Sequence, residues 1–305
     1  MIIITSGKKY LDIDAFACCF AYNRLLRILG EDSIVLSTAY MNKSIIPEFR
    51  NKDFTLFRSY TLQNERDSFV IMDVSNPNYF EDFVELNRIN MIIDHHTGFE
   101  NYWKNKLGNF AKIEFIGAAA TLVFEEFEKR GLTNFIDTDL AQLLMAAILD
   151  NTLNFSANIT SPRDYHAYQK LKDISKKENF AQYYFTICQE NINNNIVEAI
   201  KNDIKYIKTE SSFYLPNCIG QLTLWDVNYI FNKMDLVTSF FNSLSHKWIF
   251  NLICLKENKS YIISNNYLIQ KTLEHIFSRT FYNNIIQLDY PILRKEIMKK
   301  FETLE

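Results

Sequence analysis

Four apolar runs in the first half of this chain are each followed closely by acidic or histidine residues, and this arrangement constrains the fold most. The runs are residues 1–5, 69–72, 90–93 and 143–149. In an alternating α/β domain such runs are buried strands or helices, and their polar ends meet at the carboxyl edge of the sheet, where ligands bind. The polar residues that follow the runs are Asp12, Asp14, Asp73, Asp94, His95, His96 and Asp150.

These polar residues predict a metal site. Five carboxylates and two imidazoles in one cleft would repel each other without a cation, so we expect two divalent ions that share the carboxylates. Each cluster also has an ordinary structural interpretation. Asp12 and Asp14 suit the first turn of a helix, Asp73 suits a turn before proline, and Asp150 suits a polar helix end. Their joint occurrence favours the metal site.

Strands alternate with helices as far as about residue 180, which predicts a mostly parallel sheet with helices on both faces. The pattern then changes and indicates a smaller α+β domain with a hairpin around 256–259. We therefore expect an α/β protein with domains at 1–185 and 199–305 and a linker at 186–198. Further helices are expected, among others, at 77–87 and 196–208.

The composition argues against several classes of protein. Net charge is -3 and no stripe of Lys and Arg is present, which argues against a duplex nucleic-acid partner. The five cysteines are odd in number and form no CxxC pair, which is typical of reduced thiols in a cytoplasmic protein. No apolar run reaches the length of about 18 residues that a membrane span needs, so we expect no membrane partner.

In this order and on these elements, the clusters resemble the four motifs of the DHH phosphoesterase superfamily. The signature motif stands here as Asp94-His95-His96, and residues 143–155 resemble the last metal-binding motif. The small-residue stretch 117–121 resembles the helix start between these two motifs. The glycine-rich GGGH-type segment that is usual in the exonucleases and cyclic-dinucleotide hydrolases of the superfamily is missing.

The second half of the chain resembles the DHHA2 domain. The matching segments are residues 203–205, 219–221 and 293–295. This domain belongs to family II inorganic pyrophosphatases and to the related exopolyphosphatase and prune proteins. The last segment is similar to their Ser-Arg-Lys motif, with Leu293 in place of serine. The resemblance covers nearly the whole chain and implies an active site in the cleft between the two domains.

The resemblance implies a manganese-dependent hydrolase, with Mg²⁺ or Co²⁺ as substitutes for Mn²⁺. Its small phosphate-containing substrate would be pyrophosphate or short polyphosphate, cleaved at a phosphoanhydride bond by a water that two ions activate. The implied metal ligands are Asp12, Asp14, Asp73, His95 and Asp150, with Asp73 bridging the ions. The implied catalytic residues are Asp73, His96 and Asp150. The implied phosphate-binding residues are Lys8, Lys9, His96, Lys205, Arg294 and Lys295.

One position departs from the family pattern. Family II pyrophosphatases have a histidine four residues before the first aspartate, and Lys8 stands at that place here. A protonated lysine has no lone pair for a metal and repels a cation. We hypothesise that Lys8 or Lys9 contacts phosphate or partly replaces the charge of a weaker metal. Exopolyphosphatase and prune-like proteins also lack this histidine, so its loss does not exclude activity.

Two other functions stay open. A phosphodiesterase acting on short oligonucleotides or signalling nucleotides would need aromatic residues for base stacking, and the Tyr and Phe residues here are mostly at core spacing. The other alternative is a catalytically weakened protein that binds phosphate or nucleotide, as prune-like proteins are partly thought to do. Two metals per chain would favour the enzyme, and one metal with tight phosphate binding would favour the binding protein. The resemblance also allows a homodimer through an edge strand.

Overall fold

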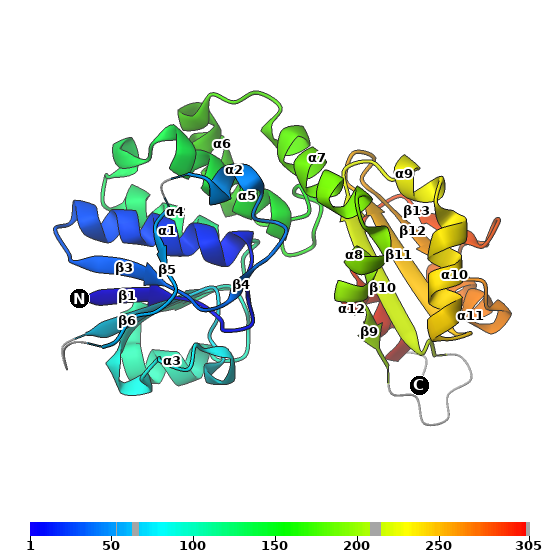
Figure 1. Ribbon diagram of the computed structural model, residues 1–305, viewed down its shortest axis with the longest axis horizontal. Helices are drawn as coiled ribbons and strands as arrows, with labels where there is room; N and C mark the ends of the chain where they lie inside the picture. Colours follow the sequence, from blue (N-terminus) through cyan, green and yellow to red (C-terminus); the bar gives the residue numbers. More distant parts are fainter. Residues whose placement is uncertain (53, 63–66, 208–214, 303–305) are drawn as a thin grey trace. The chain divides into compact units, whose positions relative to one another are not determined.

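The computed structural model describes residues 1–52, 54–62, 67–207 and 215–302 of the chain. It divides into two compact units, unit 1 from Met1 to Ala181 and unit 2 from Gln182 to Glu305 (Figure 1). Helix α7 (Phe180–Asn193) occupies much of the stretch where the sequence predicted a linker. Within the described part of the chain, no helix is both long and apolar enough to cross a membrane.

Unit 1 is built on a six-stranded sheet. Its strands are β1 (Ile2–Thr5), β3 (Ser33–Leu36), β5 (Leu56–Phe57), β6 (Ser68–Met72), β7 (Ile89–Asp94) and β8 (Ala111–Ile113), and β2 (Tyr10–Leu11) pairs separately with β4 (Tyr40–Met41). The order is β5-β3-β1-β6-β7-β8, and all neighbours are parallel. The sheet grows in one direction from β1 and in the other from β6. The place between β1 and β6 where the strand order reverses is the switch point of the sheet. Ligands of open α/β sheets bind at such a switch point, beyond the carboxyl ends of the strands.

Helices cover both faces of this sheet, as its buried apolar strands require. The helices are α1 (Ile13–Ile28), α2 (Pro47–Arg50), α3 (Glu100–Leu107), α4 (Ala119–Lys129), α5 (Thr138–Asn151) and α6 (Pro162–Ser175). Figure 1 shows α1, α4 and α5 on one side of the strands and α3 on the other. Ser161 caps α6, because its side chain accepts a hydrogen bond from the amide of Asp164.

The helix expected at 77–87 does not form, and this prediction was wrong. Two short 3-10 turns, η1 (Pro77–Tyr79) and η2 (Leu86–Arg88), flank an irregular stretch instead. The reason is a tertiary contact of Glu81, whose buried carboxylate accepts hydrogen bonds from side chains and amides of residues 37–39. A buried carboxylate requires such partners, so this contact outweighs the local helical pattern.

Unit 2 contains a five-stranded mixed sheet. Its strands are β9 (Lys205–Tyr206), β10 (Cys218–Leu224), β11 (Trp248–Cys254), β12 (Lys259–Ile263) and β13 (Ile285–Leu288). The order is β13-β12-β11-β10-β9, in which β10 and β11 are parallel and the other pairs antiparallel. The pair of β11 and β12 is the hairpin expected around 256–259. The helix expected at 196–208 is shorter than predicted, because the chain leaves it at Asn202 to form β9.

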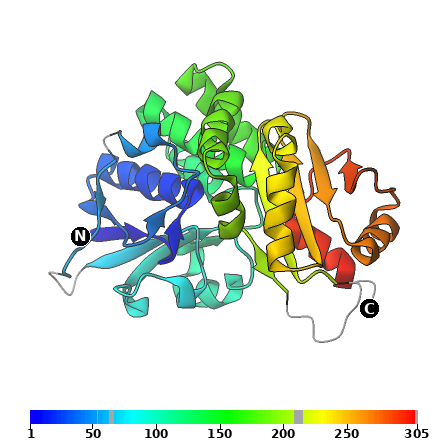
Figure 2. The same cartoon turned by 45° about the vertical axis from the view of Figure 1, so that its right-hand side comes forward.

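The sheet of unit 2 also has helices on both faces. They are α8 (Ile196–Asn202), α9 (Asn228–Phe231), α10 (Met234–Leu244), α11 (Tyr267–Phe277) and α12 (Arg294–Glu302). One apolar cluster joins α8, α9 and α10 to the sheet, and a second joins α11 and α12 to its other face. Figure 2 shows α10 and α12 on opposite sides of the strands.

Candidate metal centre

A cavity of about 490 Å³ lies at the switch between β1 and β6. Residues from three loops form its wall: 6–12 after β1, 73–76 after β6 and 96–99 after β7. Parallel strands place these loops at the same edge of the sheet. The structure therefore brings the first three sequence clusters together at one place in unit 1.

Asp73 is a buried carboxylate with an unsatisfied oxygen. Its side chain is 5% exposed, and Oδ1 has no hydrogen-bond partner among the described residues. Its backbone has a φ of 57°, in the left-handed region that Asp adopts more readily than most residues. Leaving such an acceptor buried costs about 1–3 kcal/mol. A bound cation would satisfy this oxygen.

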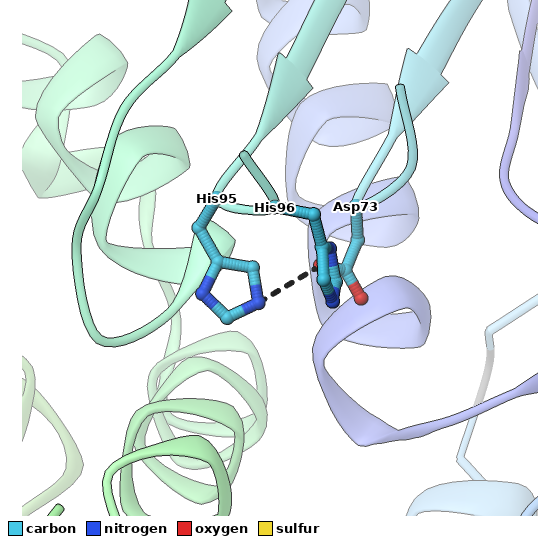
Figure 3. A group of neighbouring side chains, drawn as sticks. All are labelled: Asp73, His95 and His96. Atoms are coloured by element: carbon cyan, nitrogen blue, oxygen red, sulfur yellow. Dashed lines mark ion pairs between the residues drawn. The ribbon is translucent and has the colours of Figure 1, made fainter. Parts of the chain in front are cut away.

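His95 presents one ring nitrogen to this carboxylate (Figure 3). Its Nδ1 lies 3.0 Å from the carbonyl oxygen of Ile116, so Nδ1 carries the proton and donates it. Nε2 then has a free lone pair and lies 3.4 Å from Asp73 Oδ1 and 3.9 Å from Asp14 Oδ2. Metal-bound histidines are commonly oriented by such a hydrogen bond to a backbone carbonyl. Asp73, His95 and His96 offer ligand atoms within 4.8 Å of one another.

Asp14 is fully buried and connects α1 to α4. Its oxygens accept hydrogen bonds from the amides of Ala119 (2.9 Å) and Ala120 (2.8 Å), and Cys18 Sγ lies 3.4 Å from Oδ1. Because α4 has no cap from its own N-cap side chain, Asp14 supplies the cap from α1. Burial raises the pKa of Asp14 to about 6, and the charge of Asp12 adds to this effect, whereas His95 and the two amides oppose it.

The crowding of negative charge is unfavourable in the absence of a cation. Burial raises the pKa of Asp73 well above its ordinary value, and the charges of Asp14, Asp12 and Asp94 act in the same direction. A divalent cation reverses this effect because it stabilises the ionised carboxylates. Carboxylate oxygens with an imidazole nitrogen suit Mn²⁺ and similar ions. The donor atoms present therefore fit a divalent metal.

Asp94 shapes the turn that carries both histidines. Its Oδ1 accepts hydrogen bonds from the amides of His95 (2.7 Å) and His96 (3.0 Å) and lies 2.8 Å from His96 Nδ1. Burial opposes ionisation of Asp94, but hydrogen bonds from His96 and Ser75 outweigh it and lower the pKa of Asp94. The same contact raises the pKa of His96, which is 64% exposed and borders the cavity. His96 therefore suits hydrogen-bond donation to a phosphate oxygen better than metal ligation.

Asp12 and Asp150, the other expected ligands, have more ordinary surroundings. Asp12 borders the cavity and caps α1, where its Oδ1 accepts a hydrogen bond from the amide of Ala15 (3.0 Å). Asp150 is half-buried in the last turn of α5, which packs against α1. Like Asp14, neither belongs to the group of close ligand atoms, and the roles of all the expected residues as metal ligands stay predictions.

Lys8 and Lys9 contribute to the wall of the same cavity. Lys8 Nζ lies 2.8 Å from Asp82 Oδ1, in an ion pair whose aspartate is 90% exposed. Lys9 Nζ lies 5.7 Å from the ring centre of Tyr79. Both lysines add positive charge beside the carboxylates, and their contact with phosphate stays a prediction.

The other basic residues expected to bind phosphate lie in unit 2. Lys205 is exposed on β9, and Arg294 and Lys295 begin α12. Arg294 is already held by Asp203, because its Nη1 donates to the Asp203 carbonyl and lies 3.1 Å from Asp203 Oδ1. Sequence reasoning missed this contact, and it missed the carbonyl of Ile116 that orients His95.

The N-terminal part of the chain has a recognised family pattern. Residues 2–148 match the sequence model described as DHH family, N-terminal domain. A probable manganese-dependent inorganic pyrophosphatase of Exiguobacterium sp. is 23% identical over 99% of this chain and 97% of its own length. A second such relative, from Lactobacillus gasseri, is 22% identical over 58% of this chain, and the match spans 56% of that relative.

Solved structures share the fold of the whole chain. A candidate family II inorganic pyrophosphatase of Methanococcus jannaschii matches with a TM-score of 0.60 and 19% identity, with 99% of both chains covered. An exopolyphosphatase-related protein of Bacteroides fragilis has a TM-score of 0.52 and 16% identity, covering 99% of this chain and 90% of that chain. These matches confirm the expected fold class. Residues 2–148 therefore carry the pattern of the N-terminal domain of the DHH family, and the whole chain shares the fold of these two structures.

Proposed function

We propose that this protein is a metal-dependent phosphohydrolase that cleaves phosphoanhydride bonds, with inorganic pyrophosphate or short polyphosphate as substrate. The observation that carries the proposal is the unsatisfied Asp73 Oδ1, which lies 3.4 Å from the lone-pair nitrogen of His95. A divalent ion at such a place supplies Lewis-acid stabilisation of phosphate oxygens and lowers the pKa of a water. The names of the relatives, which specify manganese, support Mn²⁺ as the ion.

The residues proposed to act divide into metal ligands in unit 1 and phosphate-binding groups, some in unit 1 and some in unit 2. The proposed ligands are Asp12, Asp14, Asp73, His95 and Asp150. His96 is held toward its protonated form by Asp94 and would donate to a phosphate oxygen. Lys8, Lys9, Lys205 and Lys295 would act as point charges, and Arg294 as a planar fork. A homodimer, a cytoplasmic location and the domain limits stay predictions.

Phosphate release by the purified protein with Mn²⁺ tests the proposal. Pyrophosphate, tripolyphosphate, long polyphosphate and a dinucleotide are compared, with Asp150→Ala as the variant control. We expect rapid release from pyrophosphate that is lost with a chelator and in the variant. Preference for longer chains would indicate an exopolyphosphatase, and cleavage of the dinucleotide would favour the phosphodiesterase. Release from none of the four would favour a phosphate-binding protein without catalysis.

Lys8→His is expected to strengthen metal binding. Lys8 borders the same cavity as Asp12 and Asp73, and an ammonium group there disfavours a cation, whereas an imidazole would supply a ligand. We expect Mn²⁺ titration calorimetry to show more ions per chain or an affinity higher by about tenfold. Lys8→Met removes the charge without adding a ligand, so it separates the two effects. Unchanged stoichiometry and affinity in Lys8→His would show that Lys8 does not affect the metal centre.

A further inference from the structure

The segment 292–294, directly before and at the start of α12, is held by polar side chains from three neighbouring strands of unit 2. Ser260 Oγ on β12 accepts a hydrogen bond from the first amide of the segment (2.8 Å), and Asn251 Nδ2 on β11 donates to its first carbonyl (2.7 Å). Gln221 Oε1 on β10 accepts from the amide of Arg294 (2.7 Å) and from Asn251 Nδ2 (3.2 Å). The backbone that leads into Arg294 is therefore fixed at three points.

These polar side chains lie against an apolar core. Asn251 and Ser260 are fully buried, and the cluster on this face of the sheet includes Ile219, Ile249 and Ile262. Asn251 Oδ1 has no hydrogen-bond partner among the residues that the structure describes. Burying an unsatisfied amide oxygen is unfavourable, so stability alone does not explain this choice of residues.

A structural explanation accounts for part of the arrangement. A segment that crosses a buried sheet face needs partners for its backbone groups, and the three strand side chains supply them. It does not account for a fourth contact, which acts on the side chain of Arg294. Arg294 Nη1 donates to the Asp203 carbonyl and lies 3.1 Å from the Asp203 carboxylate.

The fourth contact leaves one side of the guanidinium available. No described residue accepts a hydrogen bond from Nε or Nη2 of Arg294, and its side chain is 24% exposed. Nε and Nη2 lie on the same edge of the planar group and match the spacing of two phosphate oxygens. Because Nη1 is occupied, the side chain offers this edge in a fixed orientation.

We propose that Asp203 is a positioning residue that orients Arg294 for phosphate binding, with Gln221 fixing the backbone of Arg294. The inference rests on the proposed function, because it takes Arg294 as a phosphate-binding residue. Asp203 acts through the guanidinium and needs no contact with the substrate. Asp203 is half-exposed, so we expect the protein to fold with alanine at this position.

Asp203→Ala tests this inference. Alanine keeps the backbone carbonyl that accepts from Nη1 but removes the carboxylate 3.1 Å from it, so the guanidinium samples more orientations. The dissociation constant of inorganic phosphate, measured by calorimetry on Mg²⁺-loaded protein, should therefore rise about tenfold. The KM for pyrophosphate should rise by a similar factor, and kcat should change less than about twofold. Asp203→Asn keeps an acceptor and should lie between the parent and Asp203→Ala. In an Arg294→Met background, Asp203→Ala should cause no further loss.

Asp226→Ala is the matched control, because Asp226 pairs with Lys256 at 3.0 Å elsewhere in unit 2. It should leave phosphate binding unchanged. Unchanged or tighter phosphate binding in Asp203→Ala would contradict the inference, because the carboxylate would then only oppose the charge of phosphate. A further loss in the Arg294→Met background would also contradict it. A parent that binds phosphate but hydrolyses nothing would refute the proposed function alone, and a parent that binds no phosphate would refute both.

Discussion

Asp73→Asn is expected to abolish hydrolysis and Mn²⁺ binding while stabilising the metal-free protein. Asparagine has nearly the same size and tolerates the left-handed backbone at φ 57°. It cannot supply the negative charge that holds a cation beside His95 Nε2. Hydrolysis should fall by at least about a thousandfold. Calorimetric titration with Mn²⁺ should show no binding at concentrations that saturate the parent.

The expected gain in stability follows from the pKa of Asp73. Burial and the charges of Asp14, Asp12 and Asp94 raise this pKa above its ordinary value of 3.8, so the folded state binds the proton more tightly than the unfolded state. Stability of the metal-free parent therefore falls as pH rises from about 4 until the folded-state pKa is passed. The asparagine side chain of the variant does not titrate, so the stability of the variant does not fall with rising pH for this reason.

Thermal unfolding with a chelator at about pH 5 and about pH 8 measures this difference. The advantage of Asp73→Asn over the parent should be larger at the higher pH. Asp32→Asn, at an exposed position of the same unit, should not differ from the parent in this way. A lower melting temperature of Asp73→Asn at about pH 8 would show that the Asp73 carboxylate stabilises the metal-free fold, contrary to this account.

Asp14→Ala should have the opposite effect on the metal-free protein, although Asp14 is also a buried carboxylate. Its oxygens accept hydrogen bonds from the amides of Ala119 and Ala120, which begin α4. Alanine removes the cap and leaves these two buried donors without a partner. The expected loss in the free energy of unfolding is about 2 kcal/mol or more.

Chemical denaturation with a chelator at about pH 5 measures this loss. At that pH, below the pKa of Asp14 at about 6, the parent carries mostly the protonated and therefore less unfavourable form of this group. The difference in the free energy of unfolding between the parent and Asp14→Ala should narrow at higher pH, because the ionised Asp14 carboxylate destabilises the folded parent. Asp14→Asn keeps one acceptor oxygen, so its free energy of unfolding should fall less than that of Asp14→Ala.

Asp137→Ala provides the comparison for Asp14→Ala. Asp137 caps α5 through the amide of Leu140 (2.9 Å), but its side chain is 51% exposed. Water can replace that hydrogen bond, so we expect a loss of about 1 kcal/mol with activity retained. If Asp14→Ala costs no more than Asp137→Ala, the buried cap on α4 does not contribute as proposed. The loss of stability in Asp14→Ala would then need another cause.

The amino-acid sequence by itself determined the fold class and the place of the first three clusters. The apolar run at 90–93 lies in β7, which ends at Asp94, and His95 and His96 follow the strand as expected. Such features are predictable because burial of a strand and the polarity of its end are local properties of neighbouring residues. The alternation of strands and helices then places these ends at one edge of a parallel sheet.

The tertiary structure alone decided how each side chain of the site is held. The carbonyl of Ile116 fixes the proton of His95 on Nδ1, the amides of α4 bind Asp14, and the carbonyl of Asp203 holds Arg294. The loop at 37–39 likewise prevents the helix expected around Glu81. These contacts join groups between 21 and 106 positions apart. Most of them use backbone atoms, which every residue has, so no pattern of side chains in the sequence marks them.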